Sequence, residues 1–187
     1  MKCIIGLGNP GDGYARTRHN TGYYLVEKLS HAYSEPLKLQ SKFKAAVGTV
    51  TDSGQKLLFV QPTTFYNLSG EAARSLRDFY KFENSDILVI HDELALPFGT
   101  IRARIGGSDA GNNGIKSLTQ HLGQDYARLR VGIGSPLATV AAATDFVLGR
   151  FTQEEQSQLD GKLLDITKQY VDQFLDGRLE AHTSVAS

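Results

Sequence analysis

The sequence predicts a single α/β domain, built as a three-layer sandwich in which helices flank a mixed, mostly parallel β-sheet. Short runs that are apolar at every position alternate along the chain with segments whose apolar residues recur at helical spacing. Such runs are typical of strands buried on both faces. No repeat, low-complexity tract or linker divides the 187 residues. We therefore expect one domain over residues 1–187, with the tail after about residue 177 loosely held.

The first half of the chain is expected to supply a strand, a helix and a hairpin. Residues 3–7 form an apolar run closed by glycine, asparagine and proline, which predicts a buried strand ending in a turn. Residues 21–33 place four apolar side chains on one helical face. Residues 43–51 and 55–60 flank a turn at 52–54, which predicts an antiparallel pair.

The second half is expected to alternate strands and helices. One strand would place Arg102 and Arg104 on the same face, because their positions alternate with apolar residues. A capping box from Thr152 to Glu155 predicts the start of a long helix that Gly177 ends. The expected elements are helices over 68–79, 113–121 and from 152 to 177, and strands over 87–90, 100–105 and 129–133.

Composition excludes several classes of protein. Cys3 is the single cysteine, so neither an intrachain disulfide nor a multi-cysteine zinc site is possible. No apolar run approaches the ~18 residues of a membrane helix and no signal-peptide pattern opens the chain, so we expect a soluble, cytoplasmic protein. Twenty basic and twenty acidic residues cancel, which argues against a general nucleic-acid coat protein. Residues 95–135 nevertheless carry five basic and two acidic side chains, so a local basic patch stays open.

The glycine-rich loop after the first expected strand matches a dinucleotide-binding fingerprint only in its spacing. Gly6, Gly8 and Gly11 fit the pattern G-x-G-x-x-G. A dinucleotide site needs a helix to begin at once, so that its N-terminus meets the pyrophosphate. Here Asp12 and Gly13 follow instead, and the chain has no Walker A sequence. The sequence therefore disfavours nucleotide binding of either kind.

Polar residues beside the turns indicate hydrolytic chemistry. One histidine with a nearby carboxylate would make a general base with an orienting partner, and these segments contain His19, His91, Asp92 and Glu93. The asparagine amides of the same segments could hold a substrate carbonyl or stabilise an oxyanion. The single cysteine lies inside a strand and no serine occupies a nucleophile-elbow pattern, so water is the better attacking group.

Each of these residues also has a structural interpretation. The Asn-Pro-Gly and Asn-Asn-Gly sequences form turns. Asn20 could cap the helix that follows it, and Asp92 and Glu93 could be loop charges. No histidine pair has metal-ligand spacing, so we expect no metal site. Spacing alone therefore leaves two classes, an α/β hydrolytic enzyme or a binding domain.

Several groups of residues also form a pattern in chain order. They are Gly6-Leu7-Gly8-Asn9-Pro10-Gly11, Tyr14 with Thr17-Arg18-His19-Asn20, Pro62-Thr63-Thr64-Phe65 with Asn67-Leu68-Ser69-Gly70, His91-Asp92-Glu93-Leu94 with Leu96-Pro97, Gly106-Gly107, Asn113-Gly114, and Arg128-Leu129-Arg130-Val131-Gly132-Ile133-Gly134. Over about residues 2–175, this pattern resembles the bacterial-type peptidyl-tRNA hydrolase family. Several spaced motifs in the right order are more specific than any one of them.

The resemblance implies an enzyme that hydrolyses the ester between a peptide and the 3′ ribose of tRNA, which recycles tRNA from aborted translation. It implies that His19 is the general base that activates water and that Asp92 orients His19. It also implies that asparagine amides position the substrate and the water or support the oxyanion, and that Asn113 binds the peptide backbone. Tyr14 would line the site near the tRNA terminus. The substrate-binding residues so implied are Asn9, Tyr14, Asn67, Tyr66 and Asn113.

Contact with tRNA would depend on phosphates rather than base edges, because the implied substrate class includes all tRNAs. The resemblance implies neither a metal nor another cofactor. We expect a monomer with peptidyl-tRNA as its partner and without contact to DNA or membranes. The basic residues expected to bind phosphate are Arg102, Arg104, Lys116, Arg128 and Arg130.

The sequence also departs from the family pattern. Asn112 stands where the family usually has histidine, Tyr66 stands where methionine is common, and Asp109 adds a negative charge near the expected cleft. Residues 135–144, which resemble the family's lid, contain no lysine or arginine. Some relatives keep the fold as RNA-splicing factors, so the alternative is an RNA-binding protein without hydrolase activity. A peptide- or nucleoside-handling enzyme would leave the basic residues of 95–135 unexplained.

Overall fold

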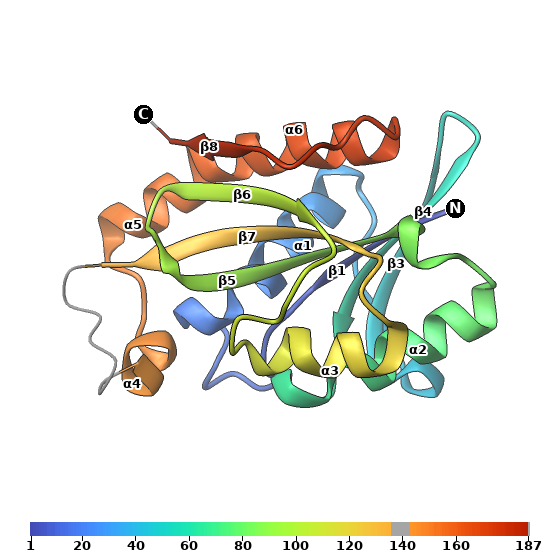
Figure 1. Ribbon diagram of the computed structural model, residues 1–187, viewed down its shortest axis with the longest axis horizontal. Helices are drawn as coiled ribbons and strands as arrows, with labels where there is room; N and C mark the ends of the chain where they lie inside the picture. The colour runs from blue at the N-terminus through green and yellow to red at the C-terminus, as the bar shows by residue number, and fades with distance from the viewer. Residues whose placement is uncertain (136–142, 187) are drawn as a thin grey trace.

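An eight-stranded sheet forms the middle layer of the protein (Figure 1). The computed structural model describes residues 1–135 and 143–186. The strands are β1 (Lys2–Gly6), β2 (Lys38–Gln40), β3 (Ala45–Asp52), β4 (Gln55–Pro62), β5 (Ile87–Pro97), β6 (Thr100–Ile105), β7 (Ala127–Gly134) and β8 (Thr183–Val185).

The sheet is parallel in its centre and antiparallel at its edges. Its strand order is β2-β3-β4-β1-β5-β7-β6-β8. β1 pairs in parallel with β4 and β5, and β5 pairs in parallel with β7. β2, β3, β6 and β8 add antiparallel pairings on the two sides. The predicted mixed sheet and its hairpin are confirmed.

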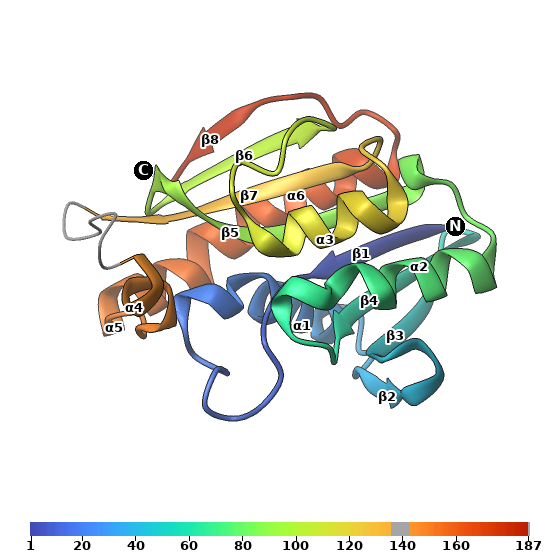
Figure 2. The same cartoon turned by 60° about the horizontal axis from the view of Figure 1, so that its bottom comes forward.

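Helices cover both faces of the sheet. In Figure 2, α2 and α3 lie in front of the sheet, while α1 and α6 lie behind it. In the described part of the chain, no helix is long and apolar enough to cross a membrane. The α-helices are α1 (Thr21–Ala32), α2 (Ser69–Tyr80), α3 (Asn113–Leu122), α4 (Ala143–Leu148), α5 (Gln153–Gln158) and α6 (Leu164–Leu175). Short 3₁₀ turns are η1 (Arg18–Asn20), η2 (Ser41–Phe43), η3 (Tyr66–Leu68) and η4 (Asn84–Asp86), and a π-helical turn, η6 (Leu159–Leu163), joins α5 to α6.

The central strands are apolar at every position because each face packs on helices. In β1, Ile4 belongs to the core beneath α1 and α6, whereas Cys3 and Ile5 belong to the core beneath α2 and α3. The same alternation places Leu129 and Val131 of β7 in the first of these cores. Their neighbours Arg128 and Arg130 therefore lie on the opposite face, the one that carries α3.

β5 is longer than the apolar run predicts. The run 87–90 continues as strand to Pro97, so His91, Asp92 and Glu93 lie within the strand and are buried rather than following its end. The pairing of β5 with β7 shifts register between Glu93 and Pro97. Gly132 permits the two strands to approach closely at this shift, because a Cβ at residue 132 would lie 2.1 Å from the carbonyl oxygen of Pro97. The longer strand therefore carries three buried ionisable side chains beyond its apolar run.

Ala72, Ala73 and Leu76 form the buried face of α2, whereas Leu68 and Phe79 are exposed. One further expectation needs correction. The chain after residue 177 is not loosely held, because β8 pairs with β6 and Leu179 lies in the core. The C-terminal helix begins at the predicted capping box. The segment compared with a lid falls largely on residues 136–142, outside the described residues.

Candidate active site

A cavity of about 490 Å³ opens past the carboxyl end of β1 and beside the middle of β5. Ligands commonly bind at this edge of an open α/β sheet. Helix α4 contributes one wall, which includes Val147 and Leu148. The polar residues that line the cavity are Asn9, His19, Tyr66, Asn67, Asp92, Glu93, Asn112, Asn113 and Thr144.

His19 and Asp92 form a hydrogen-bonded pair in this cavity. His19 Nδ1 lies 2.8 Å from Asp92 Oδ2. An ionised carboxylate only accepts hydrogen bonds, so Nδ1 is the nitrogen that carries the proton. The Asp92 side chain is 5% exposed and that of His19 is 21% exposed. His19 therefore keeps Nε2 as a hydrogen-bond acceptor on the side of the ring away from Asp92.

Close backbone packing places His19 against β5. His19 belongs to η1, which leads directly into α1. A Cβ on Gly22, in the first turn of α1, would lie 2.2 Å from the carbonyl oxygen of Ile90 and 2.5 Å from the amide nitrogen of Leu7. Glycine is therefore required for the start of α1 to approach the strand ends this closely.

Arg18 anchors the same turn from the other side. Its guanidinium donates to the carbonyl oxygen of Arg150 at 2.5 Å and to Glu155 Oε2 at 2.8 Å. It also lies over the rings of Phe146 and Phe151. The sequence motif included Arg18 without a role, and the structure shows that it ties η1 to the segment from α4 to α5.

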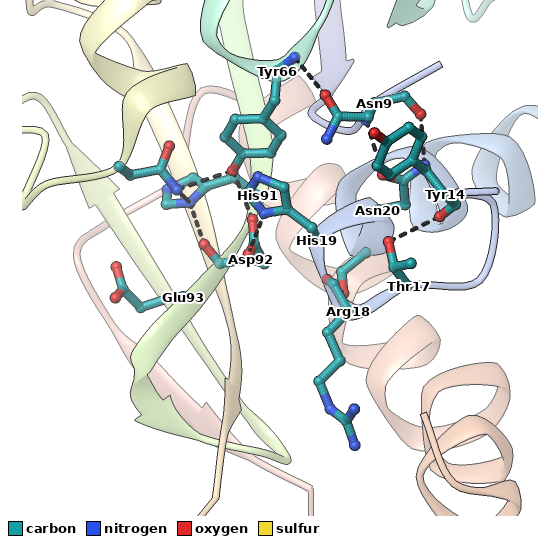
Figure 3. Close-up of polar contacts among 12 residues, drawn as sticks. Asn9, Tyr14, Thr17, Arg18, His19, Asn20, Tyr66, His91, Asp92 and Glu93 are labelled. Carbon is teal, nitrogen blue, oxygen red and sulfur yellow. Dashed lines mark hydrogen bonds and ion pairs between the residues drawn. The ribbon is translucent and has the colours of Figure 1, made fainter. Parts of the chain in front are cut away.

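Asn9 and Asn20 hold each other across the loop between β1 and α1 (Figure 3). The backbone nitrogen of Asn9 donates to Asn20 Oδ1 at 2.8 Å, and Asn20 Nδ2 donates to the backbone carbonyl oxygen of Asn9 at 2.9 Å. The side chain of Asn20 makes no capping hydrogen bond at the start of α1, so the capping interpretation is wrong. Asn9 Oδ1 accepts from the amide of Tyr66 at 2.9 Å. Its Nδ2 is therefore the donor left for a ligand.

Tyr66 is buried beside the His19–Asp92 pair. Its hydroxyl donates to Asp92 Oδ1 at 2.6 Å, and its ring is stacked on the ring of His19, with centroids 3.8 Å apart. Figure 3 shows both rings approaching Asp92. Burial, with the charge of Asp92 second, raises the pKa of Tyr66 well above its usual value, so the hydroxyl stays protonated. From the sequence, Tyr66 was expected only as a substrate contact that departs from the methionine common in the family.

The other expected substrate contacts divide into two groups. Asn67 and Asn113 are exposed at the rim of the cavity, at η3 and at the first residue of α3. Tyr14 lies in the loop between β1 and η1 and is not part of the cavity wall. Asn112 was noted only as a departure, yet its Oδ1 caps α3 by accepting from the amide of Ile115.

His91 was expected at a strand end but is buried inside β5. Its Nδ1 donates to the carbonyl oxygen of Asp92 at 2.7 Å. Burial lowers the pKa of His91. Among the described residues, no hydrogen-bond partner reaches its Nε2. His91 is therefore a neutral neighbour of the site and not an alternative base facing the cavity.

A row of arginines lies on the α3 face of β6 and β7. Arg102 stands opposite Arg130, and Arg104 stands opposite Arg128. Arg102 and Arg104 are exposed, as is Lys116 of α3. The predicted shared face of Arg102 and Arg104 is consistent with this register.

Two of these arginines are already engaged. Arg128 is buried and donates to the carbonyl oxygens of Ser108 and Gly106, so it supports the glycine-rich loop and is not available to phosphate. Burial lowers the pKa of its guanidinium. Arg130 is paired with Glu93, with its nitrogen 2.9 Å from the carboxylate. Arg130 thus joins the arginine row to the wall of the cavity.

Comparison with known proteins gives a consistent match. The family model described as peptidyl-tRNA hydrolase matches residues 3–187. A peptidyl-tRNA hydrolase of Wolinella succinogenes is 46% identical over 180 residues, which cover 96% of this chain and 90% of the relative. One of Bacillus subtilis is 47% identical over 161 residues, or 86% of this chain and 85% of the relative. The crystal structure of peptidyl-tRNA hydrolase from Acinetobacter baumannii is 36% identical, with a TM-score of 0.88, and covers 95% of this chain and 90% of that one.

Proposed function

Because the chain belongs to the peptidyl-tRNA hydrolase family, and so releases tRNA from peptidyl-tRNA, we propose that His19 is its general base and Asp92 the residue that orients it. The observation that carries this proposal is the 2.8 Å contact between His19 Nδ1 and Asp92 Oδ2 beside the cavity. The contact holds one tautomer of the ring and leaves Nε2 as the basic nitrogen. Asp92 also stabilises the imidazolium that forms when His19 takes a proton.

In the proposed reaction, His19 Nε2 takes a proton from a water molecule as the water oxygen attacks the ester carbonyl carbon. The carbonyl oxygen becomes an oxyanion, and the intermediate then collapses by breaking the bond to the ribose oxygen. The proton passes from His19 to that oxygen, which leaves as the ribose hydroxyl, while the peptide leaves as a carboxylic acid. A positioned base of this kind contributes roughly 10²–10⁴-fold.

Amide groups around the cavity are suited to the carbonyl end of the substrate. Asn9 Nδ2 is oriented as a donor, because Asn9 Oδ1 is occupied by the amide of Tyr66. Asn67 is exposed on the cavity wall and can also position water or the developing oxyanion. We assign Asn113 to the peptide backbone of the substrate, and Tyr14, which lies outside the cavity, to the region near the tRNA terminus.

The exposed side chains of Arg102, Arg104 and Lys116 are proposed to bind tRNA phosphates. Arg130 is expected to assist them while it stays paired with Glu93. Phosphate contacts carry no sequence information, which suits an enzyme that acts on all tRNAs. We propose that the protein acts as a monomer in the cytoplasm, where tRNA is used.

The experiment that tests the catalytic assignment compares two substrates and two proteins. Wild type and His19→Ala are incubated with N-blocked aminoacyl-tRNA and with the unblocked form, and released tRNA is measured. We expect release from the blocked substrate by wild type only, with a fall in kcat of roughly 10²–10⁴-fold in the variant. The same melting temperature for both proteins would show that the variant is folded. Near-normal turnover by folded His19→Ala would refute the role of His19.

A further inference from the structure

The hydroxyl of Tyr66 connects the catalytic pair to the start of α3. It lies 2.6 Å from Asp92 Oδ1 and 2.9 Å from Asn112 Nδ2. We propose that Tyr66, oriented by Asn112, is a positioning residue that fixes the Asp92 carboxylate and thereby the His19 ring. The inference rests on the proposed function of His19 and Asp92, and it adds two residues that act through them.

The directions of the hydrogen bonds that join Asn112, Tyr66 and Asp92 are determined by the cap of α3. Asn112 Oδ1 accepts from the amide of Ile115 at 3.0 Å, because Asn112 caps α3. The side-chain nitrogen of Asn112 must therefore face Tyr66, where it donates to the phenol oxygen. The phenol proton is then left for Asp92. Helix α3 thus sets the orientation of a group two contacts away.

Asp92 receives one donor on each carboxylate oxygen. Tyr66 donates to Oδ1, and His19 donates to Oδ2. Two donors on opposite oxygens restrict rotation of the carboxylate, and hydrogen bonds to an ionised group are the stronger ones. If the phenol donor were removed, the carboxylate could turn, and His19 would lose the single orientation that aims Nε2 at the cavity.

The ring of Tyr66 restricts His19 directly. The two rings are stacked at 3.8 Å with an angle of 19° between their planes. The ring reaches this position because residue 114 is glycine: a Cβ on Gly114 would lie 2.4 Å from Tyr66 Cε1. Tyr66 itself is 4% exposed, so little of it is available to a substrate. The contacts of Tyr66 are therefore those of a residue that holds the His19 ring in place.

The test begins with Tyr66→Phe, which keeps the ring and removes only the hydroxyl. We expect kcat on N-blocked aminoacyl-tRNA to fall between about 10- and 100-fold, because small errors in placing a catalytic group are costly. KM should change less than twofold, because the residue does not hold the substrate. A matched control is Tyr126→Phe, which removes another buried hydroxyl, bonded to Thr119 of α3. Its kcat should equal that of wild type.

A second variant tests the part played by Asn112. Serine is a good helix cap, so Asn112→Ser should keep α3 intact while its shorter side chain loses the contact with Tyr66. We expect a smaller fall in kcat than for Tyr66→Phe. In a Tyr66→Phe background the same change should have no further effect, because both substitutions break one chain of contacts.

Three outcomes would overturn the inference. Tyr66→Phe with wild-type kcat would mean that the hydroxyl is unnecessary. A raised KM with unchanged kcat would make Tyr66 a substrate contact instead. Independent, additive losses in the two variants would separate Asn112 from Tyr66. His19→Ala is assayed alongside: if it is inactive, any of these results removes only this inference, whereas an active His19→Ala removes the proposed function itself.

Discussion

The proposed catalytic end of the sheet, where His19 and Asp92 lie, and the arginine row on β6 and β7 are built in opposite ways. At the catalytic end, side chains from separate segments are buried against one another, and His19, Asp92 and Tyr66 each have defined partners. On the arginine row, neighbouring strand positions present Arg102 and Arg104 to solvent. The first region depends on fixed distances between atoms, and the second depends on the number and sign of exposed charges.

This difference fits what the two proposed tasks require. Proton transfer needs atoms held to within a fraction of an ångström, and only buried, mutually supported groups provide that. Phosphate binding acts through charge over longer distances and tolerates mobile side chains. Arg130 belongs to both regions, because it stands in the arginine row and is paired with Glu93 on the cavity wall. We therefore expect substitutions in the two regions to change different kinetic constants.

The largest expected effect comes from Asp92→Asn. An amide at this position can present a donor to His19 Nδ1, which would stabilise the wrong tautomer of the ring. We expect kcat to fall roughly 10²–10⁴-fold with little change in KM. Steady-state kinetics on N-blocked aminoacyl-tRNA measures both constants.

Asp86→Asn is the matched control for that substitution. Asp86 immediately precedes β5 at its other end, where it is paired with Lys2 at 2.9 Å. Its loss should leave kcat unchanged. If the two variants had equal activity, the catalytic end would not depend on the charge of Asp92, and the contrast between the regions would fail.

A smaller effect is expected from Gly22→Ala, which tests the close packing that places His19. The added Cβ would meet the backbone of Ile90 at 2.2 Å, so α1 must move away from the strand. Overpacking of this kind costs about 1–3 kcal/mol. The free energy of unfolding is measured with urea, and kcat should fall with it because His19 moves. Gly161→Ala, at a helical position with open space around it, should lower neither of them.

The smallest effect is expected from Arg104→Ala. Because its guanidinium is exposed, KM should rise a few-fold, and its dependence on salt concentration should weaken by about one phosphate contact. The value of kcat should not change. The measurement is KM over a range of KCl concentrations.

Arg128→Ala provides the contrast on the neighbouring strand. Arg128 stands opposite Arg104 but is buried and bonded to backbone carbonyls. We expect it to lower stability and to leave the salt dependence of KM as in wild type. A change in salt dependence for Arg128→Ala alone would place the RNA contact beneath the glycine-rich loop instead of on the exposed row.

The sequence predicts most of the secondary structure because apolar periodicity follows burial. The run at 87–90 identifies a central strand, but it could not show that β5 continues through His91, Asp92 and Glu93. Those polar residues break the apolar pattern, whereas their pairing with β7 continues the strand. The strand in the tail could not be predicted for a related reason, since β8 is short and depends on pairing with β6.

The site could be predicted in its residue types but not in its connections. His19 and Asp92 are separated by 73 positions, and their contact depends on how β1 and β5 pair. The role of Asn112 could not be found from sequence, because an asparagine before a helix is explained by capping alone. Only the structure shows that Asn112 Nδ2, which takes no part in the cap, reaches the hydroxyl of Tyr66.

The central place of β1 has a consequence for the order in which the protein can assemble during its own synthesis. β1 is the first strand to leave the ribosome, yet both of its neighbours, β4 and β5, begin only at Gln55 and Ile87. At about 5–20 residues per second, the apolar N-terminal segment must wait for seconds before a partner strand exists. The strand that carries Asp92 completes the pair with His19 later still. Under the proposed mechanism, a nascent chain is therefore inactive until about half of its 187 residues have been made.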